Sequence, residues 1–264
     1  MKLLALSFLL VLAAQDEKIT LKFNPRKGDK LSKTQKMELQ LKLSVDAGGQ
    51  TQEVEFEQRG TTKRLSEFAE VEGGKVTRLL VDYIEDFDEK KEPPNMEWTR
   101  TDNAMHGRKF TLSMKDGKLV REGVEGLKEK ELKKLNLDTM DAKLFPDKAI
   151  AVGDTWEVKG EALEDFLATS EEIKDMTLKA KLTAIKEIDK RRCALIDATL
   201  EMKGKAENDI GFSGKMDVEI VVWIERGYVL SSKGKGKMTI KGDNDQFSMT
   251  GEGPITIEST VKVE

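Results

Sequence analysis

Residues 37–45 read MELQLKLSV, with an apolar side chain at every odd position and a polar one at every even position. Successive side chains of a β-strand point to opposite faces of a sheet, so this run predicts a long antiparallel strand with one buried and one solvated face. The alternation recurs in further segments, at residues 19–23, 54–56, 110–114, 210–224 and 247–263. We expect about ten such strands along the chain.

The connections between these segments carry turn residues. They include Gly-Gly at 73–74, Asp-Gly at 116–117, Asp-Lys at 189–190 and Arg-Gly at 226–227. Asp-Gly between two alternating runs is the strongest of these hairpin signals. The predicted fold class is mainly β (α+β), with a long antiparallel meander that forms a curved sheet or half-barrel.

Two central segments lack the alternation and predict helices. Residues 124–135 place apolar side chains on a loose helical stripe, and residues 161–169 place Leu163, Phe166 and Leu167 at i, i+3 and i+4. A sheet with one apolar face needs a cover. We therefore expect the two helices to form a lid over the sheet.

The first residues, MKLLALSFLLVLAA, have the plan of a secretory signal peptide, with a charged start, a short apolar run and small residues at the end. We expect a signal peptide at 1–14 and one β-rich domain at 15–264. The alternative is two small β domains joined near 124–147. The expected location is periplasmic or secreted, and the apolar run is too short for a membrane span of about 20 residues.

Composition narrows the partners. The chain has 45 basic and 49 acidic residues and a net charge of −4, which argues against a nucleic-acid partner. Its one cysteine, Cys193, can form no internal disulfide, and no cysteine follows the apolar run to accept a lipid anchor. Cys193 lies in an alternating run, so we expect a half-buried strand residue.

The sequence predicts no catalytic residue, no metal site and no cofactor. Its one histidine, His106, excludes sites built on two imidazoles, and the nucleophile-elbow, phosphate-loop, dinucleotide and Cys-x-x-Cys motifs are missing from the sequence. The acidic runs at 85–89 and 243–245 lack the spacing of a calcium loop. We expect a non-enzymatic protein, with a hydrolase that uses acidic residues as a lesser alternative.

Residues 227–241 form a glycine-rich strand beside a second one. Small residues take one face of the pair, namely Ser232, Gly234, Gly236, Gly251 and Gly253. Glycine in a strand marks a bend or the close approach of another backbone, so these positions predict strong curvature. The alternative is a bare wall that leaves room for a ligand, which makes the five residues candidate ligand contacts on a concave face.

The opposite face of the same strand carries a row of lysines. They are Lys233, Lys235, Lys237 and Lys241. Cross-strand neighbours of opposite charge stabilise a sheet. We expect these lysines to pair with carboxylates of neighbouring strands rather than with an anionic ligand, with Asp217, Glu219, Glu225, Glu252 and Glu258 as the candidates.

The run FPDKAIAVGDTW at 145–156 predicts a structural turn. Pro146 ends the helical region, Gly153 and Asp154 make a tight turn, and Trp156 anchors the next strand in the core.

Together, the signal peptide, the first strand with residues 27–31, the 145–156 run and the glycine-rich penultimate strand resemble a family of exported bacterial proteins of unknown function. The expected architecture is also similar to the lipoprotein-carrier and lipoprotein-receptor half-barrels, in which a curved antiparallel sheet is lidded by helices and holds acyl chains on its concave face. That likeness implies a lipid or an apolar peptide as partner, and it transfers no residue. The alternative is a structural or protein-interaction module of the cell envelope whose core is filled.

Overall fold

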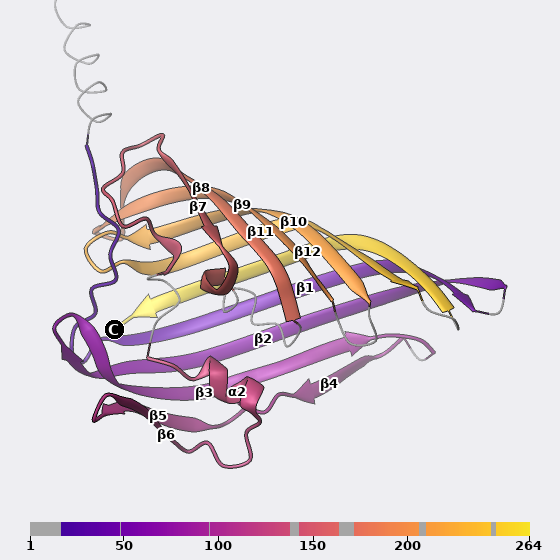
Figure 1. Cartoon of the computed structure of the whole chain (residues 1–264), viewed down its shortest axis with the longest axis horizontal. Coiled ribbons are helices and arrows are strands. Elements are labelled where there is room, and N and C mark those ends of the chain that lie inside the picture. The colour runs from indigo at the N-terminus through magenta and orange to yellow at the C-terminus, as the bar shows by residue number, and fades with distance from the viewer. Residues whose placement is uncertain are drawn as a thin grey trace, which may run out of the picture.

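A single sheet of twelve strands organises the described part of the chain (Figure 1). The computed structural model describes residues 17–47, 49–94, 96–137, 143–163, 172–205, 210–243 and 247–264. The strands are β1 (Lys30–Ala47), β2 (Gln50–Glu72), β3 (Lys75–Lys91), β4 (Trp98–Asp102), β5 (Lys109–Lys115), β6 (Lys118–Glu122), β7 (Thr155–Lys159), β8 (Glu172–Ile188), β9 (Arg191–Lys205), β10 (Gly211–Trp223), β11 (Tyr228–Asp243) and β12 (Phe247–Val263). The predicted mainly β class is confirmed. The signal peptide prediction falls on residues outside the described ranges.

The strand order places the first and last strands side by side. It runs β6-β5-β3-β2-β1-β12-β11-β10-β9-β8-β7, with β4 paired to β3, and the pairs are antiparallel. We call β1–β6 the N-terminal wing and β7–β12 the C-terminal wing. The β1–β12 ladder, from Leu31 opposite Val263 to Ala47 opposite Phe247, joins the two wings into one open, curved sheet (Figure 1).

Short hairpins connect most neighbouring strands where turn residues were expected. Asp116 and Gly117 join β5 to β6 with φ angles of 51° and 72°, and Asp189 and Lys190 join β8 to β9 with 50° and 61°. Both central residues with positive φ are the mark of the type I′ turn, which matches the twist of antiparallel strands. The residue types at these turns therefore favour the hairpins that connect the strands of the meander.

The two-helix lid is not found in the described residues. They contain one α-helix, α2 (Glu129–Lys134), which is shorter than the predicted 124–135 segment. At the second position the chain forms a 3₁₀ turn, η2 (Gly160–Leu163), and residues 164–171 lie outside the described ranges. Six residues are too few for a stable isolated helix. Accordingly α2 is held by its flanks, because Leu135 is buried and its carbonyl accepts a 2.7 Å hydrogen bond from Arg121 Nε.

Two apolar clusters lie on one side of the sheet, which we call the inner face. The first covers the C-terminal wing and the centre and includes Leu39, Leu200 and Ile255. The second covers part of the N-terminal wing and includes Phe68 and Leu112. The segment that precedes β1 closes on the first cluster through Ile19, which forms an isolated bridge with Ile150. No helix in the described residues combines the length and apolar character needed to cross a membrane.

Candidate functional site

The five predicted ligand contacts all lie on the inner face. Their cross-strand partners place them there, since Gly236 stands between Met216 and Ile255, and Gly234 between Val218 and Ile257. Ser232 is buried opposite Ser259. The five positions thus form a strip of small residues along β11 and β12.

Neighbouring atoms already occupy the space beside three of these glycines. A Cβ at Gly236 would collide with the carbonyl oxygen of Lys215, and one at Gly253 with that of Gln40. At Gly251 the side chain of Leu43 fills the position. Glycine is therefore required at 236 and 253 by the close approach of the adjacent backbone, which is the geometry of a strongly curved sheet.

The predicted turn residues hold the entry to β7. The Gly153 backbone N–H donates to the Leu182 carbonyl at 2.7 Å, with a φ of 100° that suits glycine. Asp154 accepts the Ala151 N–H at 2.9 Å, and the Trp156 indole donates to the Leu144 carbonyl at 3.0 Å. Pro146 is half-buried close to this indole contact. These contacts hold residues 143–156 against the C-terminal wing and have a structural role.

A row of polar side chains crosses the inner face between the two apolar clusters. The strand registers place these side chains directly opposite one another, in the order Ser232, Ser259, Gln35, Thr62 and Asp86. The adjoining inner-face positions on β1, β2 and β3 are also polar, with Lys33 opposite Arg64, and Asp88 beside Gly60. We call these eight polar side chains the polar belt. The members on β1–β3 are half-buried.

Asp86 is the most embedded acid of the polar belt. Its Oδ1 accepts hydrogen bonds from Thr62 Oγ1 at 3.0 Å and from Asn103 Nδ2 at 3.5 Å. Burial raises the pKa of the carboxyl, while these hydrogen bonds and the charge of Lys134 act in the opposite direction. The His106 ring accepts the Asp86 backbone N–H through Nδ1 at 3.1 Å, which requires a neutral ring in this geometry.

Among the belt residues, the sequence pattern marked Ser232 as a candidate ligand contact, and Asp86 and Asp88 only as part of the acidic run 85–89. A signal was present, because the odd positions of β1 are apolar from Met37 to Val45 but carry Lys33 and Gln35 before it. Those two residues break the alternation at the point where the strand crosses between the apolar clusters.

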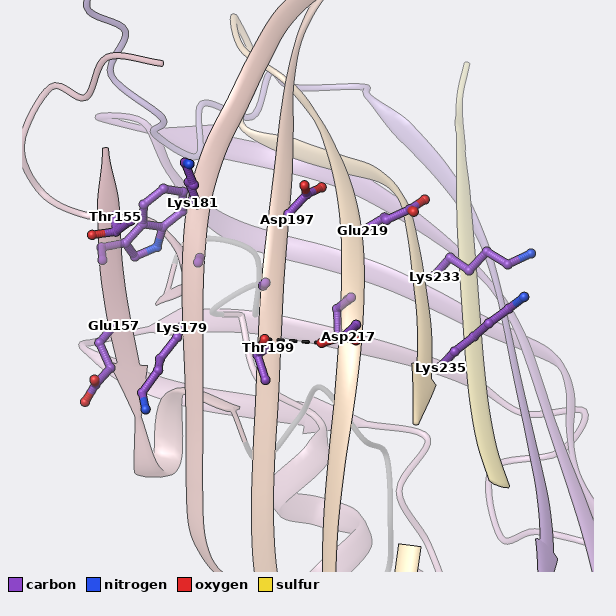
Figure 2. A pocket seen from close by; sticks show the side chains of 14 residues that line it. Thr155, Glu157, Lys179, Lys181, Asp197, Thr199, Asp217, Glu219, Lys233 and Lys235 are labelled. Carbon is purple, nitrogen blue, oxygen red and sulfur yellow. Dashed lines mark hydrogen bonds between the residues drawn. The ribbon is translucent and has the colours of Figure 1, made fainter. Parts of the chain in front are cut away.

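The outer face of the C-terminal wing carries a shallow hollow of about 1080 Å³. Figure 2 shows its charged side chains projecting from one face of β7–β11. Four lysines (Lys179, Lys181, Lys233 and Lys235) are balanced by four carboxylates (Glu157, Asp197, Asp217 and Glu219).

Cross-strand contacts neutralise charges in this hollow. Lys233 Nζ lies 2.6 Å from Glu258 Oε1, and Thr199 Oγ1 donates to Asp217 at 3.3 Å. The hydrogen bond from Lys233 lowers the pKa of Glu258. The predicted pairing of the lysine row is confirmed for Lys233. With its charges balanced, the hollow favours neither an anion nor a cation.

Cys193 is poorly placed to act as a nucleophile. Cys193 is fully buried rather than half-buried, and burial raises the pKa of its thiol. A thiol that stays protonated is a weak nucleophile. In the described residues no group of three or more His, Cys, Asp or Glu side chains could hold a metal ion.

The fold and these surfaces define a class: an open, curved antiparallel sheet with a mixed apolar and polar inner face. No protein-family model and no curated protein matches the chain. Among solved structures, a lipovitellin chain from a study of lipid–protein interactions gives a TM-score of 0.45 at 7% identity, covering 90% of this chain. This chain spans only 26% of that lipovitellin chain.

Two other solved structures cover most of both chains at lower scores. A DUF1329-family protein from Desulfovibrio piger gives a TM-score of 0.15 at 8% identity, over 90% of this chain and 86% of its own. The translocator domain of the autotransporter NalP from Neisseria meningitidis gives 0.19 at 9% identity, over 97% and 95%. All three are β-rich proteins, and the scores are too low to carry a functional argument.

Proposed function

We propose that this is a non-enzymatic binding protein that holds an apolar ligand, or an apolar segment of a partner, on the inner face of its sheet. The carrying observation is a set of partly exposed apolar side chains packed against the first cluster, which we call the distal patch: Met37, Leu43, Phe56, Met238 and Ile240. Contiguous apolar surface that remains accessible to solvent marks an interaction site.

The strand registers make the distal patch one continuous surface. Ile240 lies opposite Gly251, and Gly251 lies opposite Leu43. Only a glycine, which has no side chain, therefore lies between these two apolar side chains. Met238 flanks Gly253 in the same way. A ligand laid along β12 would therefore contact apolar side chains from both neighbouring strands.

The proposed setting is the periplasm or the outside of the cell, as the signal-peptide pattern of residues 1–14 implies. The buried thiol of Cys193 supports the non-enzymatic part of the proposal, because a buried thiol is inert.

The second candidate is a structural or protein-interaction module with a filled core. It is favoured by the contacts of Gly236, Gly251 and Gly253, whose vacant side-chain positions are taken by neighbouring strands. In that case the glycines serve curvature alone, and the inner face binds nothing small.

The test separates the two candidates by direct measurement of ligand. Protein purified from its own host is examined by native mass spectrometry and solvent extraction, and uptake of a fluorescent fatty acid is measured. We expect bound lipid and saturable uptake, weakened about tenfold in Leu43→Asn because an apolar contact is lost. Leu65→Asn on the outer face, where Leu65 is 40% exposed, is the matched control and should leave uptake unchanged. No extracted lipid together with no uptake would contradict binding.

A further inference from the structure

The inner face holds a cation, Arg64, that is in no ion pair with the described residues around it. Arg64 lies on β2 between Lys33 of β1 and Tyr83 of β3, on the same face as the two apolar clusters. Its side chain is half-buried. Within the described ranges its guanidinium makes no hydrogen bond and no ion pair.

The described carboxylates near Arg64 form no ion pair with it. Asp86 is bonded to Thr62 and Asn103, and the charges that act on it are those of Lys134 and Asp88. Asp82 lies opposite Leu65 on the outer face, where Lys109 engages it at 2.9 Å. Arg64 instead faces a second cation, since Lys33 is its direct cross-strand partner.

From this arrangement we infer that the ligand is an anionic amphiphile of the fatty-acid class, with its carboxylate on Arg64 and its chain running toward the distal patch. This inference rests on the proposed function and adds the chemical class of the ligand. A guanidinium can bind a carboxylate through two parallel hydrogen bonds.

The surrounding charges favour one negative charge over two. Asp86 and Asp88 lie on the adjoining strand of the same face, so a doubly charged phosphate would meet two carboxylates. A fatty acid brings a single charge. Met37, the nearest member of the distal patch on β1, is four residues from Lys33, or about 13 Å along the strand. That separation lies within the length of a palmitoyl chain.

The experiment compares palmitate with 1-hexadecanol, which has the same chain and no charge. We expect the wild-type protein to bind palmitate at least about tenfold more tightly, the gain of hydrogen bonds to a charged group. Arg64→Gln should abolish that preference and leave the affinity for hexadecanol unchanged. Arg64→Lys should retain part of it. Lys63→Gln, one residue away on the outer face, is the matched control and should keep the wild-type preference.

The outcomes separate this inference from the proposed function. Equal affinity of the wild-type protein for palmitate and hexadecanol would overturn the fatty-acid assignment and leave apolar binding intact. An equal loss of both ligands in Arg64→Gln, with a wild-type melting temperature, would also overturn it. Failure of both ligands to bind the wild-type protein would overturn the proposed function as well.

Discussion

The two wings of the sheet differ in what their inner faces carry. Across β8–β10 of the C-terminal wing the face is apolar, as in the row Leu178, Leu200 and Met216, and these side chains are nearly inaccessible to solvent. In the N-terminal wing the six belt residues of β1–β3 interrupt the apolar face. An apolar face is explained by packing alone. Burying a charge costs free energy unless a partner compensates it. The half-buried charges therefore point to the N-terminal wing as the part of the inner face that contacts a charged ligand.

The largest expected effect is the loss of stability when β1 and β12, which join the two wings, are forced apart. In Gly253→Val the added Cβ would collide with the Gln40 carbonyl oxygen and come within 3.1 Å of Leu41 Cα. Because backbone on β1 cannot yield as a side chain does, we expect a loss of at least about 3 kcal/mol in unfolding free energy. Urea denaturation measures it. Glu252→Val, exposed on the other face, is the control, and an unchanged stability in Gly253→Val would refute the close approach.

A pair of core truncations tests whether the wings fold as one unit. Leu200→Ala in the C-terminal wing and Leu112→Ala in the N-terminal wing remove side chains that are 0% and 1% exposed. Each should cost about 3 kcal/mol by cavity formation. Since the β1–β12 ladder joins the wings, we expect both variants to shift one common unfolding transition. Two transitions, each moved by only one variant, would instead support two domains.

The smallest of these effects concerns the polar belt and depends on pH. Burial raises the pKa of Asp86 above its ordinary 3.8, so the folded chain holds this proton to higher pH than the unfolded chain does. Stability due to this group is therefore lost as pH rises from 3.8 through the raised pKa. Asp86→Asn, which stays neutral and can still accept the Thr62 hydrogen bond, should become the more stable protein at neutral pH.

Denaturation of both proteins over a pH series provides the measurement. The stability difference should grow from acid to neutral pH in favour of the variant. A constant deficit of Asp86→Asn at all pH values would show that the carboxylate has only a structural role.

Local pattern predicted most strands and the antiparallel meander within each wing, but not the pairing that joins the two wings. Alternation locates β1, and Asp116–Gly117 marks a hairpin, because both depend on neighbours in sequence. The β1–β12 pairing brings residue 31 beside residue 263, and no local pattern specifies such a distant partner. The second predicted helix relied on Leu163, Phe166 and Leu167, but its described start is a 3₁₀ turn.

The candidate site was predicted in outline only. The glycines of β11 and β12 were recognised, while the choice between curvature and ligand contact depended on neighbouring strands that the sequence does not place. In the structure, Gly236 and Gly253 are required because the backbone of a neighbouring strand approaches them closely. The sequence did not predict Arg64 as a site residue, because its position on the inner face follows from the register with Lys33, and only the assembled sheet provides that register.

The most direct test of binding at the inner face is a methyl NMR titration of the protein with palmitate. We expect saturable shifts in the methyl groups of Met37, Leu43 and Met238, which belong to the distal patch. The outer-face Leu65, 40% exposed, should not move. Shifts confined to Leu65, or no shifts in the distal patch as palmitate is added, would contradict it.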